Sequence, residues 1–217
     1  MRRLVIIGAS GHGRVAADVA RRRGYREIVF LDDNRELRNC GKYPVIGTAA
    51  DFRRLVDEMR IPSEFFVAVG NAGIREALQK KLEYAGGTPV TLVHPDAVIG
   101  DEVRIGAGSV MMAGAVINPG TVIGGGCIIN TSSSVDHDCM LGDYVHIAVG
   151  AHVAGSVRIG DRVWIGAGAT VSNGVCICSG CTIGAGAVVI KDIGEQGTYV
   201  GVPARLTLAS AGVFQPA

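Results

Sequence analysis

An aliphatic residue recurs every six positions from Ile99 to Val189, sixteen times without interruption. Neither the 3.6-residue period of a helix nor the two-residue alternation of a flat strand produces this spacing. A six-residue period is the signature of a parallel β-helix, so the repeat predicts the fold of the second half of the chain. The sixteen residues are Ile99, Ile105, Met111, Ile117, Ile123, Ile129, Val135, Leu141, Ile147, Val153, Ile159, Ile165, Val171, Ile177, Ile183 and Val189.

The same spacing predicts how the chain coils. Each hexad forms one short strand and its corner, and three hexads close a triangular coil of eighteen residues. The aliphatic side chains then point inward, and small or β-branched residues such as Ser109 and Ala151 fill the corner four positions later. Gly follows several of the aliphatic residues, as in Ile105-Gly106, and we expect it to relax the backbone where the chain turns. The hexads give a little over five coils, about 25 Å of stacked strands.

Charged side chains divide the chain into two parts. Of the 41 Lys, Arg, Asp and Glu residues, 28 lie in residues 1–98 and 9 in residues 99–190. We therefore expect two domains, at residues 1–95 and 96–217, the second including a C-terminal tail. Large faces with little charge suggest contacts between copies of the chain. A three-sided prism suits cyclic symmetry, and we expect a homotrimer.

Composition also excludes several classes of protein. The net charge of +1 gives no electrostatic reason to expect nucleic acid or an acidic membrane as a partner. No apolar run approaches the roughly 18 residues of a membrane span. The apolar residues 4–7 run directly into a Gly turn, so we interpret them as a strand rather than a signal sequence. We expect a cytoplasmic protein.

Six cysteines raise the question of a metal site, above all in Cys176-x-Cys178-x-x-Cys181. In the hexad frame Cys181 takes the small corner position, whereas Cys176 and Cys178 stand at other offsets. We therefore expect the three thiols not to converge and to stay free rather than to bind zinc. The sequence predicts no metal.

The first domain resembles the start of a doubly wound parallel sheet. Apolar residues 4–7, 28–31, 65–69 and 90–93 are typical of buried strands, and helical stretches are expected at 14–23, 49–59 and 73–85. A strand, a Gly loop, a helix and a second strand form a Rossmann-like α/β arrangement. Ligands of such sheets bind beyond the carboxyl ends of the strands.

Those strand ends carry the candidate binding residues of the first domain, which are Gly8, Ser10, Gly11, His12 and Gly13, then Asp32 and Asp33, and finally Gly70 and Asn71. The loop reads G-x-x-G-x-G rather than the G-x-G-x-x-G of dinucleotide enzymes, and the short domain argues against NAD. Its bare amides and the following helix N-terminus suit a phosphate, while the two carboxylates suit a nucleobase or ribose. The alternative is a tight strand–helix turn with two solvated carboxylates.

Within the repeat, the densest polar segment surrounds His137. This residue stands two positions after the inward Val135, so it points outward, and Asp136 and Asp138 flank it. An imidazole beside a carboxylate is held in one tautomer and becomes more basic, which suits a general base. Eighteen residues on, Gly155 lies one coil away, where a backbone amide could stabilise an oxyanion. The alternative is a surface histidine paired with Asp for solubility.

Taken together, these segments resemble a known family. The Gly loop, Asp32-Asp33, Asn130-Thr131-Ser132, Asp136-His137-Asp138, His146 and the segment 200–205 (VGVPAR) are similar to the hexapeptide acyltransferases that acetylate nucleotide-linked amino sugars in bacteria. Within that family the resemblance is greatest to the UDP-4-amino-sugar N-acetyltransferases of the bacillosamine pathway. It covers nearly the whole chain and implies that the β-helix is left-handed.

The resemblance also implies roles for individual residues. His137 matches the general base, and Asp138 matches the acidic residue that orients it, although the family enzyme compared most closely has Glu there. His146 matches a contact to acetyl-CoA, the co-substrate, and Gly155 matches the amide near the acetyl carbonyl. The Gly loop and Asp32-Asp33 match contacts to the diphosphate and uracil, and Asn130 matches a polar residue near the sugar.

The implied reaction is a direct acetyl transfer to a 4-amino group, at sites between subunits of a trimer. Two alternatives remain open at this point, an O-acetyltransferase of a sialic-acid-like sugar and an enzyme that uses a GDP- or dTDP-linked amino sugar. Two others are disfavoured. A γ-type carbonic anhydrase is disfavoured because the histidines at 137, 146 and 152 lack an H-x-x-x-x-H pair, and a sugar-nucleotide-binding regulator without catalysis is disfavoured by His137 and its acidic neighbours.

Overall fold

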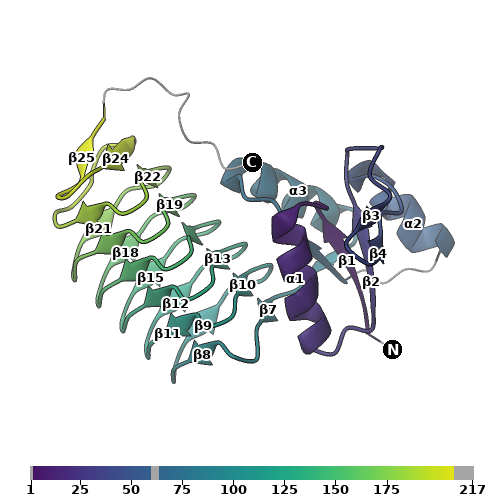
Figure 1. The fold of residues 1–217 in the computed structure, drawn as a ribbon, viewed down its shortest axis with the longest axis horizontal. Helices are drawn as coiled ribbons and strands as arrows, with labels where there is room; N and C mark the ends of the chain where they lie inside the picture. Colours follow the sequence, from purple (N-terminus) through teal and green to yellow (C-terminus); the bar gives the residue numbers. More distant parts are fainter. Residues whose placement is uncertain (1, 60–63, 208–217) are drawn as a thin grey trace. The chain divides into compact units, whose positions relative to one another are not determined.

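The computed structural model describes residues 2–59 and 64–207, and residues 208–217 of the expected tail lie outside this part (Figure 1). Contacts within the chain divide it into two compact units, one of residues 1–95 and one that begins at Asp96. No helix in the described part combines the length and apolar character needed to cross a membrane.

The first unit is built on a four-stranded parallel sheet. Its strand order is β2-β1-β5-β6, with β1 at Arg3–Ile7, β2 at Glu27–Leu31, β5 at Glu64–Val67 and β6 at Thr88–Pro89. The helices are α1 (Gly11–Arg22), α2 (Phe52–Met59) and α3 (Ala72–Tyr84), preceded in the case of α2 by a short 3-10 helix, η1 (Ala49–Asp51). A small antiparallel pair, β3 (Asn39–Cys40) and β4 (Tyr43–Pro44), follows β2, and β7 is at Leu92–Val93.

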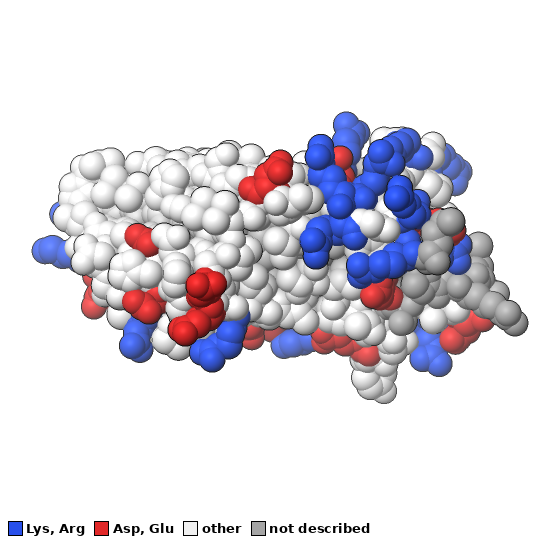
Figure 2. All heavy atoms as spheres, turned by 90° about the horizontal axis from the view of Figure 1, so that it is seen from below, with Lys and Arg blue, Asp and Glu red and all other residues white. Residues whose placement is uncertain are grey.

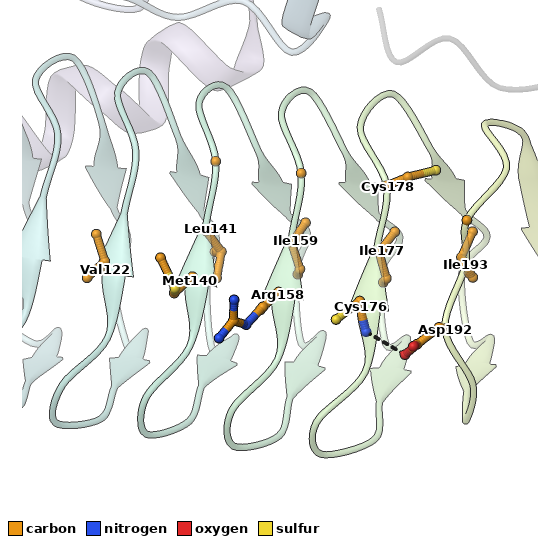
Figure 3. A pocket seen from close by; sticks show the side chains of 13 residues that line it. Val122, Met140, Leu141, Arg158, Ile159, Cys176, Ile177, Cys178, Asp192 and Ile193 are labelled. Carbon is orange, nitrogen blue, oxygen red and sulfur yellow. Dashed lines mark hydrogen bonds between the residues drawn. The ribbon is translucent and has the colours of Figure 1, made fainter.

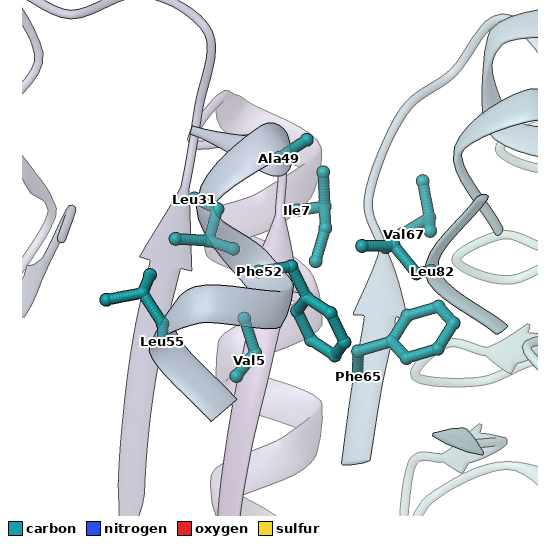
Figure 4. Packing of buried hydrophobic residues seen from close by; sticks show 9 residues of the cluster. All are labelled: Val5, Ile7, Leu31, Ala49, Phe52, Leu55, Phe65, Val67 and Leu82. Carbon is teal, nitrogen blue, oxygen red and sulfur yellow. The ribbon is translucent and has the colours of Figure 1, made fainter. Parts of the chain in front are cut away.

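Apolar side chains from the sheet and from two helices form the core of this unit (Figure 4). The strands read as continuous apolar runs because a parallel sheet is covered on both faces. Phe52 of α2 packs edge-on against Phe65 of β5, with ring centroids 5.7 Å apart. The cluster consists of Val5, Ile7, Leu31, Ala49, Phe52, Leu55, Phe65, Val67 and Leu82.

The second unit is a three-sided solenoid of two-residue strands, which confirms the predicted β-helix (Figure 1). Face 1 contains β8 (Val98–Ile99), β11 (Val116–Ile117), β14 (Ser134–Val135), β17 (His152–Val153), β20 (Thr170–Val171) and β23 (Val188–Val189). Face 2 contains β9 (Arg104–Ile105), β12 (Val122–Ile123), β15 (Met140–Leu141), β18 (Arg158–Ile159) and β21 (Cys176–Ile177). Face 3 contains β10 (Val110–Met111), β13 (Ile128–Ile129), β16 (His146–Ile147), β19 (Trp164–Ile165), β22 (Thr182–Ile183), β24 (Thr198–Val200) and β25 (Arg205–Leu206).

The register of the strands follows the predicted period. Ile117 pairs with Val135, and Val135 pairs in turn with Val153, so residues eighteen apart stack in parallel. The aliphatic residue of each hexad points into the coil, and Val135 and Ile147 are completely buried. Only at the C-terminal end does the pattern change, where β24 and β25 pair antiparallel.

The corners turn at a different position from the one expected. The backbone is left-handed three residues after each of the first fifteen aliphatic residues, from Glu102 to Gly186. Nine of these are Gly, and the other six are Glu102, Ser132, Asp138, Tyr144, Ser156 and Arg162. Gly directly after the aliphatic residue has no positive φ, so the expectation that it relaxes the turn is wrong.

Close approach of the next coil explains the Gly directly after the aliphatic residue. A Cβ on Gly124 would lie 2.5 Å from the carbonyl oxygen of Gly142, and one on Gly160 would lie 2.6 Å from the nitrogen of Ser179. Gly106 and Gly142, at the same corner of other coils, would also meet the backbone of the following coil. These residues are therefore small because the coils stack tightly at the corner after face 2.

We expect Gly124→Ala to destabilise the solenoid by about 1–3 kcal/mol, because the added methyl group must displace the main chain of the next coil. Gly194→Ala is the matched control, since a Cβ there meets nothing within 4 Å and φ is not positive. The control should change stability by less than about 0.5 kcal/mol. Chemical denaturation followed by circular dichroism measures both, and equal losses would show that coil stacking is not the cause.

Candidate active site

His137 and Asp138 form a hydrogen-bonded pair at the corner between faces 1 and 2. They follow β14, and Asp138 occupies the left-handed turn position with φ of 57°. Asp is one of the few residues other than Gly that adopts this conformation readily. The turn directs its carboxylate back to the preceding ring, where Oδ2 lies 2.9 Å from His137 Nδ1. The His137 side chain is 58% exposed, so it faces outward as predicted.

This pair determines the protonation of the imidazole. A carboxylate only accepts hydrogen bonds, so Nδ1 carries the proton and Nε2 keeps its lone pair. The hydrogen bond to Asp138 raises the pKa of His137 above its ordinary value, and the charges of Asp136 and Asp138 act in the same direction. The result is a more basic Nε2 that points away from its acidic partner.

A second carboxylate supports the same corner from the other side. Asp136 Oδ1 accepts hydrogen bonds from Asn118 Nδ2 at 2.6 Å and from the His137 amide at 2.8 Å. The bond from Asn118 is the main reason that the pKa of Asp136 is lowered, so this carboxylate stays ionised. Sequence reasoning noted Asp136 only as a neighbour of His137 and missed Asn118. The signal was present, because Asn118 stands eighteen residues before Asp136.

Gly155 lies directly against the His137 ring. A Cβ on Gly155 would be 2.5 Å from His137 Nε2, so any larger residue would displace the imidazole. The neighbouring Ser156 amide donates to the His137 carbonyl at 2.8 Å and fixes the two coils together. Within the described residues, the Gly155 amide has no hydrogen-bond acceptor. A basic nitrogen therefore lies next to a residue whose N–H donor is available.

His146 and Asn130 lie on a different part of the solenoid. His146 is in β16 on face 3, and its Nε2 is 3.3 Å from Asn130 Nδ2. The ring also packs edge-on against Trp164, with centroids 6.4 Å apart. The structure thus brings His137, Asp138 and Gly155 together and places His146 and Asn130 as a separate pair in the same chain.

In the first unit, the Gly loop lies between β1 and α1. Gly8 has a φ of 102°, and a Cβ on Gly13 would collide with the carbonyl oxygen of Gly8, so both positions require Gly. Ser10 is the N-cap residue of α1 but makes no side-chain capping bond, and no acidic residue occupies the first turn. The amides of Gly11 and its neighbours at this helix N-terminus are thus arranged to bind an anion.

The two carboxylates after β2 accept hydrogen bonds from main-chain amides. Asp32 accepts from the Ala9 amide at 2.7 Å and from the Asn34 amide at 2.9 Å, using one oxygen for each. Asp33 Oδ1 accepts from the Ala49 amide at 3.3 Å. Asp32 also lines a hollow of about 330 Å³ together with Arg35, Leu37, Arg38, Val45, Ile46, Gly47, Thr48 and Asp51. Sequence reasoning did not identify these other residues of the hollow.

The loop after β5 contains Gly70 and Asn71. Asn71 Oδ1 accepts from the Ile74 amide at 3.0 Å and so caps α3. Arg75 of α3 is buried, and its Nη1 donates at 2.8 Å to the carbonyl oxygens of Val69 and Gly70. This buried arginine, which was also missed from the sequence, fixes the loop from below.

Arg75 also influences His12 at the start of α1. Burial, and then the positive charge of Arg75, lower the pKa of His12 to about 4, so its ring is neutral at pH 7. His12 Nε2 is buried and has no hydrogen-bond partner within the described residues. The Gly loop therefore presents an uncharged imidazole rather than a cation.

The thiols of the Cys-x-Cys-x-x-Cys segment correct one expectation. Cys178 Sγ and Cys181 Sγ are 3.4 Å apart, so two of the three thiols do converge. In the described part of the chain, no three His, Cys, Asp or Glu side chains are grouped so that they could hold a metal ion.

The pKa of His12 should lie below the ordinary histidine value of 6.5, and the pKa of His137 should lie above it. NMR of the imidazole protons should give a pKa near 4 for His12 and a pKa above 6.5 for His137. Asp138→Asn should lower the pKa of His137, because the variant loses the charged acceptor, and should leave that of His12 unchanged. A His137 titration that does not move in the variant would contradict the assigned pairing.

Comparisons with known proteins identify the families to which the two parts of the chain are similar. Residues 3–82 match the family described as the PglD N-terminal domain, and residues 96–131 and 156–191 match the bacterial transferase hexapeptide family. A curated relative, the UDP-N-acetylbacillosamine N-acetyltransferase of Bacillus subtilis (strain 168), is 34% identical over 117 residues, which are 52% of each chain.

Two solved structures are similar over almost the whole chain. The acetyltransferase domain of PglB from Neisseria gonorrhoeae FA1090, in complex with acetyl coenzyme A, is 41% identical with a TM-score of 0.88, covering 95% of this chain and 99% of that one. PerB from Caulobacter crescentus, in complex with CoA and GDP-perosamine, is 35% identical with a TM-score of 0.90, covering 95% and 98%. The chain therefore belongs to the hexapeptide-repeat family of acetyl-CoA-dependent N-acetyltransferases that act on nucleotide-linked amino sugars.

Proposed function

We propose that this chain transfers the acetyl group of acetyl-CoA to the 4-amino group of a UDP-linked amino-deoxy sugar in bacterial glycan biosynthesis. The observation that carries the proposal is the close approach of Gly155 to His137 Nε2, where an added Cβ would lie 2.5 Å from the nitrogen, with Asp138 on the opposite ring nitrogen. This arrangement supplies a base and an amide donor at one point. Both accelerate the attack of an amine on a thioester.

The transfer needs no covalent enzyme intermediate. The sugar amine attacks the thioester carbonyl while His137 Nε2 removes a proton from the amine. The Gly155 amide donates a hydrogen bond to the oxyanion, which then collapses to the amide and expels the CoA thiolate. His137, now an imidazolium stabilised by Asp138, returns its proton to the thiolate. Positioning supplies much of the rate, and general-base catalysis supplies a factor of about 10²–10⁴.

The first unit supports binding of the nucleotide. The free amides at the start of α1 and the neutral His12 suit the diphosphate, since Nε2 can donate without a competing partner. We assign the base to the residues after β2. Both oxygens of Asp32 already accept hydrogen bonds from main-chain amides. One oxygen of Asp33 accepts a hydrogen bond from the Ala49 amide. The remaining Asp33 oxygen suits the single imide N–H of uracil better than the paired N–H donors of guanine.

A GDP-linked sugar is the second candidate, because the PerB structure contains GDP-perosamine. We expect CoA release to be fastest with the UDP form in a panel of UDP-, GDP- and dTDP-linked 4-amino sugars. Thiol release from acetyl-CoA measures this, with detection of a base-stable amide product as the check for N-acetylation. Turnover with the GDP form alone would overturn the assignment of uracil.

We also propose that three copies assemble and that each active site lies between two of them. His137 and His146 are on different parts of one chain, so a site that uses both requires a neighbour. On the face seen in Figure 2, Lys and Arg gather over the first unit, whereas much of the solenoid surface is uncharged and its charged residues lie mainly along the lower edge of the view. Apolar side chains such as Val149 and Ile190 are exposed on the solenoid, as expected for contacts between copies.

The proposal includes a cytoplasmic location, which the state of the thiols supports. All six cysteines are free in the structure. Proteins of reducing compartments keep their thiols in this form, whereas exported proteins of this size often carry disulfides.

We expect His137→Ala to reduce turnover by about 10²–10⁴, because the amine then loses its proton to water. Binding of the nucleotide sugar, measured by calorimetry, should be unchanged. His152→Ala is the matched control, since His152 is an exposed histidine one coil later whose Nδ1 contacts Ser134 at 2.9 Å. Unchanged turnover in the His137 variant would remove this residue from the mechanism.

Mixing variants extends this test to the assembly. His137→Ala and His146→Ala should each have strongly reduced turnover at limiting acetyl-CoA. Refolding the two variants together should restore activity at about one site in four, because random trimers then pair an intact His137 with an intact His146 of the neighbour. No recovery in trimers of verified mixed composition would overturn the shared site.

A further inference from the structure

One corner of the last complete coil differs from the coils before it. After face 2, the residue that follows the aliphatic position is Gly106, Gly124, Gly142 and Gly160 in four successive coils, and Cys178 in the fifth. A Cβ at each of the four Gly positions would meet the backbone of the next coil. Above Cys178 the chain no longer forms a full hexad, and the Cys178 amide donates to the Ile193 carbonyl at 2.8 Å. The final coil therefore has room for a side chain that the other four exclude.

This side chain meets the thiol of Cys181. Cys178 and Cys181 flank the two-residue turn at Ser179 and Gly180, and their Sγ atoms are 3.4 Å apart. The first and fourth residues of a β-turn have Cα atoms less than about 7 Å apart, which is within the range that a disulfide can span. A modest rotation of the side chains brings the sulfur atoms to bonding distance.

Two other cysteines show that the pairing is specific to this corner. Cys127 and Cys139 occupy the same small inward position as Cys181, and both are buried. The Sγ atom of Cys127 contacts the carbonyl oxygen of Gly142 at 3.2 Å, and that of Cys139 contacts the carbonyl oxygen of Ala154 at 3.1 Å. They serve as internal controls because they are buried at the same position of their coils as Cys181.

The two thiols of the pair differ in access. Cys178 is half-buried and lines an open groove of about 650 Å³ on face 2 (Figure 3). Cys181 is completely buried, and its Sγ contacts the Glu195 carbonyl at 3.5 Å. Burial, and then the hydrogen bond with Cys178, raise the pKa of Cys181 to about 11, so this thiol stays protonated at neutral pH. A reagent that enters the groove reaches Cys178 first.

We propose that Cys178 and Cys181 form a reversible redox site that low-molecular-weight disulfides convert to an intramolecular disulfide. The Cys178 thiolate attacks one sulfur of the small disulfide and expels the other as a thiol. Cys181 then loses its proton, attacks the Cys178 sulfur of the mixed disulfide and releases the second small thiol. Two protein thiols are oxidised and one small disulfide is reduced to two thiols, so atoms and electrons balance.

Treatment of the native protein with oxidised glutathione tests the proposal. The protein is then denatured in acid, alkylated and digested, and the peptides are identified by mass spectrometry. We expect the wild-type protein to lose two alkylatable thiols, with a bond that links Cys178 to Cys181, and dithiothreitol should restore both. The thiols of Cys127 and Cys139 should remain alkylatable throughout.

Two variants separate the steps. Cys181→Ser should retain glutathione on Cys178, because no second thiol displaces it, whereas Cys178→Gly should form no intramolecular bond at this corner. Both should fold, since Ser109 occupies the small position and Gly occupies the other position in the remaining coils. Cys176→Ser, at a residue exposed on the strand before the turn, should behave like the wild type. Full alkylation of Cys178 and Cys181 after oxidation, or a bond from Cys178 to Cys176, would overturn the proposal.

Discussion

The solenoid depends on a left-handed backbone conformation at the corner of its hexads, because this conformation lets the chain turn. This conformation turns the chain by the same amount at each corner, so strands eighteen residues apart meet in register. For a residue with a Cβ it costs about 1–2 kcal/mol, which stacking on the coils above and below must offset. Asp138 is one of the six residues that accept this conformation without being Gly. The backbone conformation that turns the chain also places the Asp138 carboxylate next to the His137 ring, so the coil itself forms this hydrogen-bonded pair.

Much of the second unit follows from the sequence, because its geometry is periodic. The inward aliphatic residues and the outward His137 could be identified by counting positions. Counting eighteen also placed Gly155 beside the imidazole. The role of Gly after the aliphatic residue could not be identified in this way. Sequence shows where Gly occurs, but whether it permits a positive φ or a close approach depends on how tightly the coils stack.

Contacts between side chains were harder to predict than positions. Asn118 and Asp136 are eighteen residues apart, yet nothing in the repeat showed that an amide would reach a carboxylate. The convergence of Cys178 with Cys181 was missed because the final coil departs from the pattern and leaves space for a side chain. In the first unit, Arg75 was missed because a charged residue in a helical stretch is usually interpreted as exposed, whereas this one is buried under the loop it supports. Asp32 was correctly placed at the strand end, but its contacts with backbone amides depend on how the loops fold.

The stacking of His137 on Gly155 has a consequence for how the gene can change. The two residues belong to adjacent coils with no loop between them, so their alignment depends only on the number of residues that separate them. Gain or loss of one codon in this interval would rotate every later side chain out of register with the coil below. Duplication of a whole coil elsewhere in the solenoid would leave this pair intact. The length of this interval is therefore as constrained as the identity of the two residues.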